Sequence, residues 1–498
     1  MQKVSAVLCA MGYIADPKCK AQIPCYLRPM GRKAKQVFHK AVKVEAHAGE
    51  GKCLARIEGK VIFISDVVPG DVVDIRVNRS KKDWAEAQPV FFHQYAADRV
   101  SPFCAHFGIC GGCQWQMLPY EKQLEYKQQQ VADALQRIGK IPLPPVLPII
   151  GAPEQRFYRN KIEYTFSNKK FLTSGELADP EISAYANVAG FHAKGYFDKI
   201  VDIGTCHLQR EPSNTIRLAV KAFAIANNIP FYDFRKHEGQ LRIVQLRICR
   251  TGEVMVNVVF AYESPEAFQL LDHLLKEVPS ITTLLYTVNP KFNDSLVGLV
   301  PQVYHGKGYA IESLADFQFK IGPVSFFQTN TAQAERLYQI TREYASLTGE
   351  ECVYDLYCGT GSIGIFLSRR ARKVIGVDNV APAIEDAREN AQLNRLDNRT
   401  FFAGDVVDIC TEDFFAVHGR PDVVVTDPPR AGMHEKLIRM LLQTEAPRVV
   451  YVSCNPATQA RDVQLLAEKY SVERIQPVDM FPHTLHIENV MLLHCKKP

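Results

Sequence analysis

The feature that most constrains the fold is a regular alternation of short apolar strands and helical segments after residue 351. Five strand-like segments, CVYDLY, KVIGVD, RTFFAG, PDVVVTD and RVVYVS, are separated by stretches long enough for helices. Because parallel strands need such crossover helices, the pattern predicts a doubly wound α/β domain with a parallel sheet. The last two strand-like segments, VERIQPVDM and NVMLLHC, lie close enough in sequence to form a hairpin.

Length and composition bound the rest of the chain. With 498 residues, 47% hydrophobic and 23% charged, the chain predicts two to four globular domains and excludes a disordered, collagenous or coiled-coil protein. No run of 18 uncharged apolar residues occurs, so we expect no transmembrane helix. Residues 1–97 carry 16 Lys and Arg against 9 Asp and Glu, whereas the remainder has a net charge of −2. The positive charge of these first residues favours binding of an anionic partner, most readily a nucleic acid.

The strand and turn pattern divides the chain into domains. Short strands punctuated by glycine and proline predict a small β-barrel over residues 38–98, of a type that often binds oligonucleotides. Residues 99–325 predict a mostly β middle domain, and residues 326–498 form the α/β domain. Residues 119–139 are expected to form an amphipathic helix, whose apolar stripe consists of Leu124, Val131, Leu135 and Ile138.

The first residues match no globular pattern. We expect residues 1–37 to be an extension outside the domains, either disordered or included through an upstream start. Met30 supports the second explanation, because it begins a plausible basic start, MGRKAKQ. The apolar stretch from Val4 to Ala15 resembles a signal peptide only loosely and lacks a clear cleavage site.

A glycine-rich turn follows the first strand of the α/β domain. Gly359, Gly361 and Gly364 in DLYCGTGSIGIF form a G-x-G-x-x-G pattern, and Asp378 ends the next strand. Glycines let the backbone approach a ligand, and the acidic residue can accept ribose hydroxyls. The turn alone fits a nicotinamide dinucleotide and S-adenosylmethionine equally, since both molecules carry an adenosine.

Residues at the ends of later strands help to decide between a nicotinamide dinucleotide and S-adenosylmethionine as the ligand. Asp427 lies in TDPPRAGM after the fourth strand, in a turn typical of methyltransferases that act on bases. Cys454 follows the fifth strand in VSCNPATQ. Because open α/β sheets bind ligands at the carboxyl ends of their strands, we expect both residues to share one edge with Tyr357, Asp378 and Asp405.

The cysteines form a second cluster of interest. Fourteen cysteines are too sparse for a disulfide scaffold in a chain of this length, and their uneven spacing favours metal binding or catalysis in a reducing compartment. Zinc and a 4Fe–4S cluster both accept four thiolates, and His106 and His207 keep a zinc site with mixed ligands open. The candidate thiol ligands are the C-x5-C-G-G-C group and one distant cysteine, namely Cys104, Cys110, Cys113 and Cys206.

Together these motifs resemble the RNA (uracil-5-)-methyltransferase family of the TrmA/RumA type. The resemblance covers about residues 40–498, with the motifs in order: CAHFGICGGCQWQ, YRNKIEYTFS, SFFQTNT, DLYCGTGSIG, DPPRAG, SCNPAT and HIENV. It implies an α/β fold: a Rossmann-like S-adenosylmethionine-dependent methyltransferase domain, an N-terminal OB-like TRAM barrel and a mostly β middle domain. The implied reaction is C5-methylation of a uridine in RNA, which forms 5-methyluridine.

The resemblance also implies roles for individual residues. Cys454 matches the nucleophile and Glu488 matches the general base. The implied S-adenosylmethionine contacts are Gln328, Tyr357, Ser362, Asp378, Asp405 and Asp427. The implied ligands of a 4Fe–4S cluster, as in the ribosomal branch of the family, are Cys104, Cys110, Cys113 and Cys206. Some members have Glu at Asp378, and some have Asn at Ser362 and Asp405.

The chemistry explains why such residues are needed. Carbon 5 of uracil is too weak a nucleophile to take a methyl group unaided, but a thiolate added at carbon 6 creates an enolate with charge at carbon 5. Cys454 suits this role because thiols are partly ionised near neutral pH. The methylated carbon 5 still carries its proton, and we expect Glu488 to remove it before the thiol leaves.

Basic and aromatic residues suggest where RNA binds. The target base must leave its stack or already lie in a loop to reach Cys454. In RFYRNKIEYTF, cationic residues alternate with aromatic ones, as expected of a surface that holds phosphates and bases. These cations are Arg156, Arg159 and Lys161. Lys81 and Lys82 on the barrel are further candidates for phosphate contacts.

Three hypotheses follow for the whole protein. The first is a monomeric, cytoplasmic methyltransferase of 23S ribosomal RNA, because transfer-RNA members generally lack the barrel and the cysteine cluster. The second is the same reaction on transfer RNA, and the third is a non-catalytic RNA-binding protein. A radical S-adenosylmethionine enzyme is disfavoured, since its C-x3-C-x2-C spacing differs from the spacing found in this chain.

Overall fold

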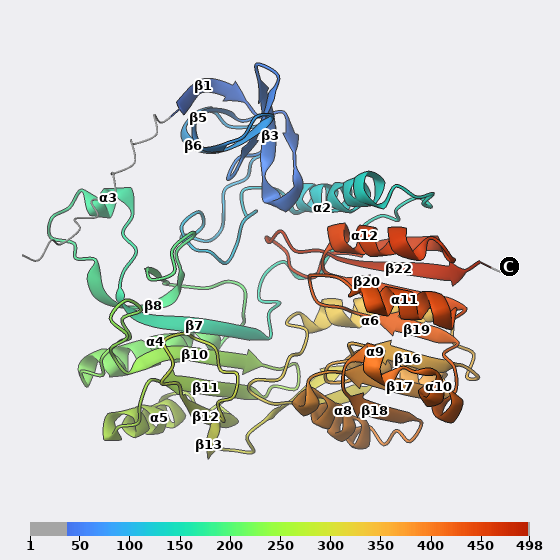
Figure 1. Cartoon of the computed structure of the whole chain (residues 1–498). Coiled ribbons are helices and arrows are strands. Elements are labelled where there is room, and N and C mark those ends of the chain that lie inside the picture. The colour runs from blue at the N-terminus through green and yellow to red at the C-terminus, as the bar shows by residue number, and fades with distance from the viewer. Residues whose placement is uncertain (1–36, 497–498) are drawn as a thin grey trace, which may run out of the picture.

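The computed structural model describes residues 37–496, which contain two seven-stranded sheets and one six-stranded sheet (Figure 1). The extension predicted over residues 1–37 lies outside the described residues, apart from Val37 at the start of the first strand. Within the described part of the chain, no helix is both long and apolar enough to cross a membrane.

The six-stranded sheet forms the blue unit at the top of Figure 1. Apolar side chains such as Ile62, Ile64 and Ile75 form its own core, which is the small β unit expected from the strand pattern. Its order is β1-β5-β6-β4-β3-β2. The strands are β1 (Val37–Lys43), β2 (Ala46–His47), β3 (Cys53–Ile57), β4 (Lys60–Ile64), β5 (Val72–Ser80) and β6 (Trp84–Gln94), with a 3-10 turn, η1 (Gly49–Gly51).

The middle of the chain builds a mostly antiparallel sheet, ordered β13-β12-β11-β10-β7-β8-β9, in which only β11 and β12 are parallel. Helices α4 (Ser213–Ala226) and α5 (Pro265–Glu277) pack against each other beside it. The strands are β7 (Lys161–Lys169), β8 (Tyr185–His192), β9 (Ile200–Asp202), β10 (Leu241–Ile248), β11 (Val254–Phe260), β12 (Thr283–Val288) and β13 (Gln302–His305). A short helix, α3 (Ser174–Leu177), precedes β8, and a hairpin, β14 (Ala310–Leu314) and β15 (Phe317–Ile321), follows the sheet.

The last part of the chain forms the predicted doubly wound sheet, ordered β18-β17-β16-β19-β20-β22-β21. Strands β16 to β20 are parallel and apolar, as expected of strands covered by helices on both faces. The predicted terminal hairpin is confirmed, since β22 pairs antiparallel with β21 and also with β20. The strands are β16 (Cys352–Leu356), β17 (Lys373–Asp378), β18 (Arg399–Ala403), β19 (Val423–Thr426), β20 (Arg448–Ser453), β21 (Tyr470–Val478) and β22 (Glu488–Cys495).

Helices cover both faces of this sheet (Figure 1). They are α6 (Thr331–Ala345), α7 (Ser362–Leu367), η3 (Ser368–Arg370), α8 (Ala381–Leu393), α9 (Val406–Ile409), α10 (Glu412–His418), α11 (Glu435–Thr444) and α12 (Pro456–Leu466). The strand order reverses between β16 and β19, so the loops after these two strands diverge. Open α/β sheets bind their ligands at such a point.

Helix α2 (Tyr120–Ala134) continues into a π-turn, η2 (Leu135–Gly139), and packs on α12. The predicted helix is therefore confirmed, and its predicted apolar stripe is confirmed in part, since Val131 and Leu135 are buried. Leu124 is only partly buried and Ile138 is exposed. The residues of the buried face are spaced four apart and are Gln123, Lys127, Val131 and Leu135. Two of them, Gln123 and Lys127, are polar. Buried polar groups need partners, and these two find them far away in the sequence.

Candidate active site

The glycine-rich turn after β16 adopts a backbone that only small residues accept easily. Gly359 has φ 53° and Gly361 has φ 75°, in the left-handed region. A side chain at Gly361 would also meet Ala387 and Phe401, each at 3.0 Å. The turn is therefore held in a tight form that leaves its amide groups close to the edge of the sheet.

Asp378 holds the turn against the neighbouring strand. Its Oδ2 accepts a hydrogen bond of 2.9 Å from the Gly359 amide, and its Oδ1 accepts one of 2.8 Å from the Val380 amide. The side chain is buried. Asp378 therefore lies at the end of β17, where the sequence placed it, and both of its oxygens have backbone partners.

A tyrosine that the sequence pattern did not reveal joins helix α6 to the turn. The Tyr338 hydroxyl lies 2.8 Å from the Ser362 hydroxyl, at the first residue of α7. Burial raises the pKa of Tyr338, and the nearby carboxylates of Asp427, Asp355 and Glu488 raise it further. Tyr338 thus faces the same acidic edge as the residues predicted from motifs. No motif marks it, because it lies on an ordinary amphipathic helix.

The loops after β19 and β20 are locked together. The Asn455 side chain accepts a hydrogen bond from the Ala457 amide at the start of α12 and donates one of 3.0 Å to the Arg430 carbonyl. The Thr458 hydroxyl also donates to that carbonyl. The DPPR and SCNP motifs therefore form one rigid unit at the carboxyl edge, with Cys454 between a strand end and a capped helix.

Sheet register brings Cys454 and Glu488 together. Ser453, the last residue of β20, pairs with Asn489 on the antiparallel strand β22. Cys454, the residue after β20, and Glu488, the first residue of β22, therefore lie at adjacent strand ends, close enough for the Glu488 charge to raise the pKa of Cys454. The two predicted catalytic residues come from opposite directions of the chain and meet at one edge of the sheet.

The environment of these residues is acidic and poorly solvated. Burial, together with the Glu488 and Asp427 charges, raises the pKa of Cys454 to about 11, although Arg430 opposes this rise. Burial raises the pKa of Asp427 to about 7. Burial and the charge of Asp427 also raise the pKa of Glu488 well above its usual value. The expectation of a partly ionised thiol at neutral pH is thus wrong for the free protein.

One further carboxyl group deepens the acidity of the edge. Asp355 in β16 is fully buried, and its Oδ2 accepts a hydrogen bond of 2.7 Å from the Gly364 amide. Its Oδ1 is buried without a hydrogen-bond partner. Burial raises the pKa of Asp355 to about 7, and Asp427 and Asp378 contribute to the rise. A cation bound near this edge would relieve the repulsion among the three carboxylates.

Two further predicted contacts, Tyr357 and Asp405, lie around the same edge. Tyr357 has φ 62°; burial raises its pKa, and the charges of Asp405 and Asp378 raise it further. Asp405 is exposed and caps helix α9 through the Val407 amide. Gln328 is buried just before α6, where its carbonyl accepts a hydrogen bond of 2.9 Å from the Asn160 side chain. It belongs to the junction between the middle sheet and α6.

The four predicted thiol ligands line one pocket. Its volume is about 30 Å³, and His106 and His207 also line it. The thiols, which are free, are Cys104, Cys110, Cys113 and Cys206. Burial raises the pKa of Cys110 to about 12 and that of Cys113 to about 11, and the neighbouring thiols raise both further. The structure thus brings together cysteines that are about 100 positions apart in sequence.

The arrangement of this pocket limits the choice of metal ligands. The His106 Nε2 accepts a hydrogen bond of 2.9 Å from the Gly204 amide, so this nitrogen is already occupied. Among residues 37–496, no group of three or more His, Cys, Asp or Glu side chains has the geometry of a metal site. The thiols share a pocket without adopting coordination geometry.

Basic and aromatic side chains surround a larger cavity beside the cysteine loop (residues 101–116). This cavity has a volume of about 440 Å³ and is lined by Arg159, Lys161 and Arg247, together with Phe326, which is 71% exposed. Arg156 lies elsewhere, with its guanidinium 3.8 Å from the centre of the Phe103 ring. Two of the three predicted cations therefore share a cavity, and the third faces a neighbouring pocket. Lys81 and Lys82 are exposed between β5 and β6.

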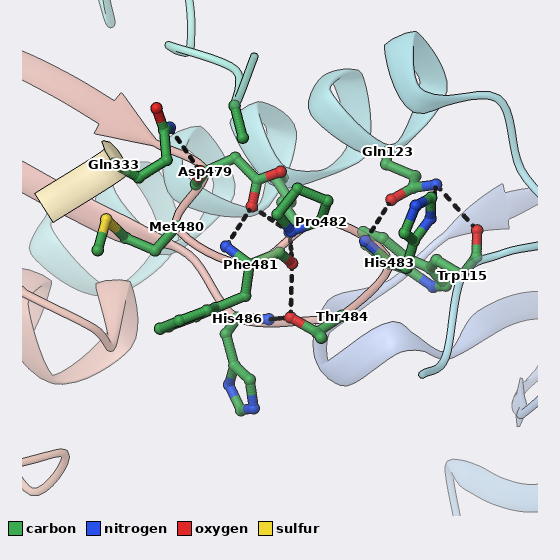
Figure 2. A network of polar contacts seen from close by, with 12 residues as sticks. Trp115, Gln123, Gln333, Asp479, Met480, Phe481, Pro482, His483, Thr484 and His486 are labelled. Atoms are coloured by element: carbon green, nitrogen blue, oxygen red, sulfur yellow. Dashed lines mark hydrogen bonds and ion pairs between the residues drawn. The ribbon is translucent and has the colours of Figure 1, made fainter. Parts of the chain in front are cut away.

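The β21–β22 loop, residues 479–487, leads directly into Glu488, and six of its nine residues are buried. Figure 2 shows its polar contacts with Gln123 and Gln333, which belong to segments distant in sequence, and the further hydrogen bond from Gln123 to the Trp115 carbonyl. Asp479 forms an ion pair of 2.6 Å with Lys127, and both side chains are 0% exposed. Sequence analysis missed this loop, because each contact pairs residues from different parts of the chain.

Comparisons with known proteins identify the family of this chain. Residues 309–496 match the family model described as tRNA (Uracil-5-)-methyltransferase, and residues 39–90 match the TRAM domain. The chain is 50% identical over 453 residues to an uncharacterized RNA methyltransferase of Bacteroides thetaiotaomicron, covering 90% of this chain and all of that protein. A relative from Porphyromonas gingivalis is 47% identical, covering 90% of this chain and 98% of that protein.

A solved structure extends the similarity to the fold. The Pyrococcus abyssi tRNA (uracil-54, C5)-methyltransferase in complex with S-adenosyl-L-homocysteine has a TM-score of 0.69 and 29% identity. The match covers 92% of this chain and the whole of that one. The fold expected from the motifs, a methyltransferase domain with an N-terminal TRAM unit, is therefore confirmed. The chain belongs to the RNA (uracil-5-)-methyltransferase family and is a methyltransferase.

Proposed function

We propose that this protein transfers a methyl group from S-adenosylmethionine to carbon 5 of a uridine in RNA. The observation that carries this proposal is the juxtaposition of Cys454 and Glu488 through the Ser453–Asn489 pair, at the edge that also holds Asp378 and Asp427. A thiol and a carboxyl group at one ligand-binding edge supply the two functions that C5-methylation requires.

The Cys454 thiol first gives up its proton to solvent, and the thiolate then forms a bond to carbon 6 of uracil. The resulting enolate attacks the methyl group of S-adenosylmethionine through carbon 5, and S-adenosylhomocysteine leaves with the electron pair of the broken sulfur–carbon bond. The Glu488 carboxylate then takes the proton of carbon 5. The electrons of that bond re-form the double bond between carbons 5 and 6, which expels the thiolate and regenerates the free enzyme.

The residues at the edge fit S-adenosylmethionine. Its sulfonium is a cation, and the carboxylates of Asp355, Asp378 and Asp427 repel one another in the free protein. We assign the donor contacts to Gln328, Tyr357, Ser362, Asp378, Asp405 and Asp427. A bound sulfonium lowers the pKa values of Asp427 and Glu488 toward their usual range. Donor binding therefore ionises the base that the later proton transfer requires.

We propose that the cysteine pocket holds a thiolate-bound 4Fe–4S cluster, which would require the thiols to move into coordination geometry. Four thiols line one small pocket, and burial raises the pKa of Cys110, with the neighbouring thiols raising it further. A positively charged metal centre would favour the ionised thiolates. The backbone hydrogen bond to His106 Nε2 disfavours the alternative in which this histidine binds zinc. When bound, the cluster would be held by Cys104, Cys110, Cys113 and Cys206.

We propose 23S ribosomal RNA as the main substrate and transfer RNA as the second candidate. The cysteine set, which resembles that of the ribosomal branch, supports the first. The second is favoured by the solved tRNA methyltransferase, because its match covers 92% of this chain. The basic cavity of Arg159, Lys161 and Arg247 suits either RNA.

Transfer of a labelled methyl group distinguishes these substrates. Purified protein is incubated with methyl-labelled S-adenosylmethionine and either unmodified 23S RNA or unmodified transfer RNA, and the nucleosides are then analysed. We expect 5-methyluridine in 23S RNA. Label only in transfer RNA would replace the proposed substrate but keep the chemistry. No label in either RNA would contradict the proposed function.

A further inference from the structure

The β21–β22 loop is the point at which the other parts of the chain meet the catalytic base. Asp479, Met480, His483, Thr484 and Ile487 are buried. The loop contains no regular helix or strand, so contacts with other segments determine its conformation. Glu488 is the very next residue and pairs with Val478. The conformation of this loop therefore fixes the chain immediately before the proposed base.

Helix α2 provides the strongest anchor. The Lys127 ammonium donates to Asp479 Oδ1 at 2.6 Å and to the Phe481 carbonyl at 3.1 Å. The Tyr120 hydroxyl donates to Asp479 Oδ2 at 2.7 Å, and the Phe481 amide donates to Asp479 Oδ1 at 3.0 Å. Asp479 is thus satisfied on both oxygens. A fully buried and fully hydrogen-bonded ion pair fixes geometry, and losing one partner leaves the other charge without compensation.

Gln123 attaches the loop one turn earlier in the same helix. Its Oε1 accepts a hydrogen bond of 2.9 Å from the His483 amide, and its Nε2 donates to the carbonyls of Trp115 and Leu118. The Gln114 and Trp115 amides donate to the His483 carbonyl at 2.8 and 3.1 Å. The loop is therefore bound to the cysteine loop immediately after Cys113.

Three further contacts complete the set. The Gln333 side chain of α6 donates to the Asp479 carbonyl at 2.7 Å, and the Tyr158 hydroxyl donates to the Pro482 carbonyl at 3.0 Å. Leu485 occupies the space in which a side chain at Gly51 of the six-stranded sheet would lie. Segments from every large part of the described chain thus contact nine consecutive residues.

We infer that Lys127 and Gln123 are positioning residues for the general base, acting through the β21–β22 loop. This inference rests on the proposed function of Glu488. Neither residue faces the reacting atoms, and their contacts fix only the loop that precedes the base. Loosening the loop therefore slows removal of the carbon 5 proton more than it slows addition of Cys454, which lies on the separate strand end of β20.

The two steps are measured separately in a single turnover. RNA substrate and S-adenosylmethionine are added to the full chain, and the covalent protein–RNA adduct and released 5-methyluridine are followed on denaturing gels over time. The test variants are Gln123→Met and the double variant Lys127→Met with Asp479→Asn, which removes both buried charges together. The control is Lys122→Met, because Lys122 lies on the same helix with an exposed side chain that pairs with Glu125.

We expect both test variants to accumulate adduct, with release of product slowed about tenfold to a hundredfold and adduct formation nearly unchanged. Lys122→Met should behave like the unmodified protein. Equal slowing of both steps, or no change in either, would overturn the inference. If one test variant fails to fold, the other decides.

A parallel reaction with Glu488→Gln separates this inference from the proposed function. If Glu488→Gln traps an adduct and the loop variants do not, only the positioning role fails. If Glu488→Gln traps none, the assignment of the base itself fails, and the positioning role fails with it.

Discussion

Cys454 and Glu488 lie at the adjacent ends of two antiparallel strands, because Ser453 pairs with Asn489. Strand β22 is the antiparallel member of an otherwise parallel sheet, and it enters beside β20 from the opposite direction. This arrangement places the start of β22 at the edge where the parallel strands end. The proposed base at the first residue of β22 would therefore reach the same ligand as the proposed nucleophile after β20.

Replacing the nucleophile should separate binding from chemistry. We expect Cys454→Ala to abolish methylation while RNA affinity changes less than about twofold, because the small side chain contributes little contact area. Label transfer and a filter-binding titration measure the two properties. Cys495, which is also free and partly exposed, provides the matched control as Cys495→Ala. Full turnover by Cys454→Ala would contradict its role.

Replacing the base should arrest the reaction after methyl transfer. Glu488→Gln keeps the size of the buried side chain but cannot accept the carbon 5 proton, so the thiol cannot leave. We expect a covalent protein–RNA species that survives denaturing electrophoresis and carries the methyl label. Digestion to a nucleotide-bearing peptide containing Cys454 identifies the bond. An unlabelled adduct would show instead that Glu488 acts before methyl transfer.

Alkylation should reveal the high pKa of the Cys454 thiol in the free protein. Only the thiolate reacts with iodoacetamide, and the pKa is about 11, so the rate should rise about tenfold per pH unit between pH 7 and 9. Peptide mass spectrometry separates Cys454 from the other cysteines. Arg430→Met should slow the reaction further at each pH, because the Arg430 charge lowers this pKa. A rate that levels off below pH 8 would contradict the prediction.

The buried carboxyl of Asp355 should make stability fall as pH rises. Its pKa is raised from 3.8 to about 7 in the folded protein, so folding favours the protonated form. That stabilisation is complete below about pH 4 and is lost as pH rises through about 7. We expect Asp355→Asn to gain stability relative to the unmodified chain between pH 5 and 8, by at most about 4 kcal/mol. Urea unfolding at pH 5 and at pH 8 measures the free energy of unfolding of both proteins. An equal gain in stability of Asp355→Asn at the two pH values would contradict the raised pKa of Asp355.

Metal content tests the cysteine pocket. We expect anaerobically purified protein to contain iron and sulfide and to absorb broadly near 400 nm, as Fe–S clusters do. Cys110→Ser and Cys206→Ser should each lose the iron, because one ligand of four is missing. Cys249→Ser, a buried cysteine outside the pocket, should retain it. Stoichiometric zinc without iron would replace the proposed cluster.

Sequence was a good guide wherever a motif encodes local geometry. Gly359, Asp378 and Cys454 follow strands whose order and direction are set by the alternation of strands and helices, so their common edge was predictable. The positions of side chains that depend on a partner far away in the sequence could not be predicted. Lys127 looks like a solvent-facing residue of a polar helix, and only Asp479, 352 positions later, explains its burial. The contact of Tyr338 with Ser362 likewise depends on how α6 packs against the glycine-rich turn, which no local motif encodes.

The β21–β22 loop also has a consequence for how the protein is made. A ribosome produces the six-stranded sheet, the cysteine loop and α2 before residues 479–487 exist, and domains generally begin folding in that order. Until the loop is synthesised, Lys127 lacks the carboxylate of Asp479 and Gln123 lacks the amide of His483 as hydrogen-bond partners. The last contacts to form during synthesis are then those of the loop before Glu488, so a chain that ends before residue 488 has the six-stranded sheet and α2 but lacks the proposed base.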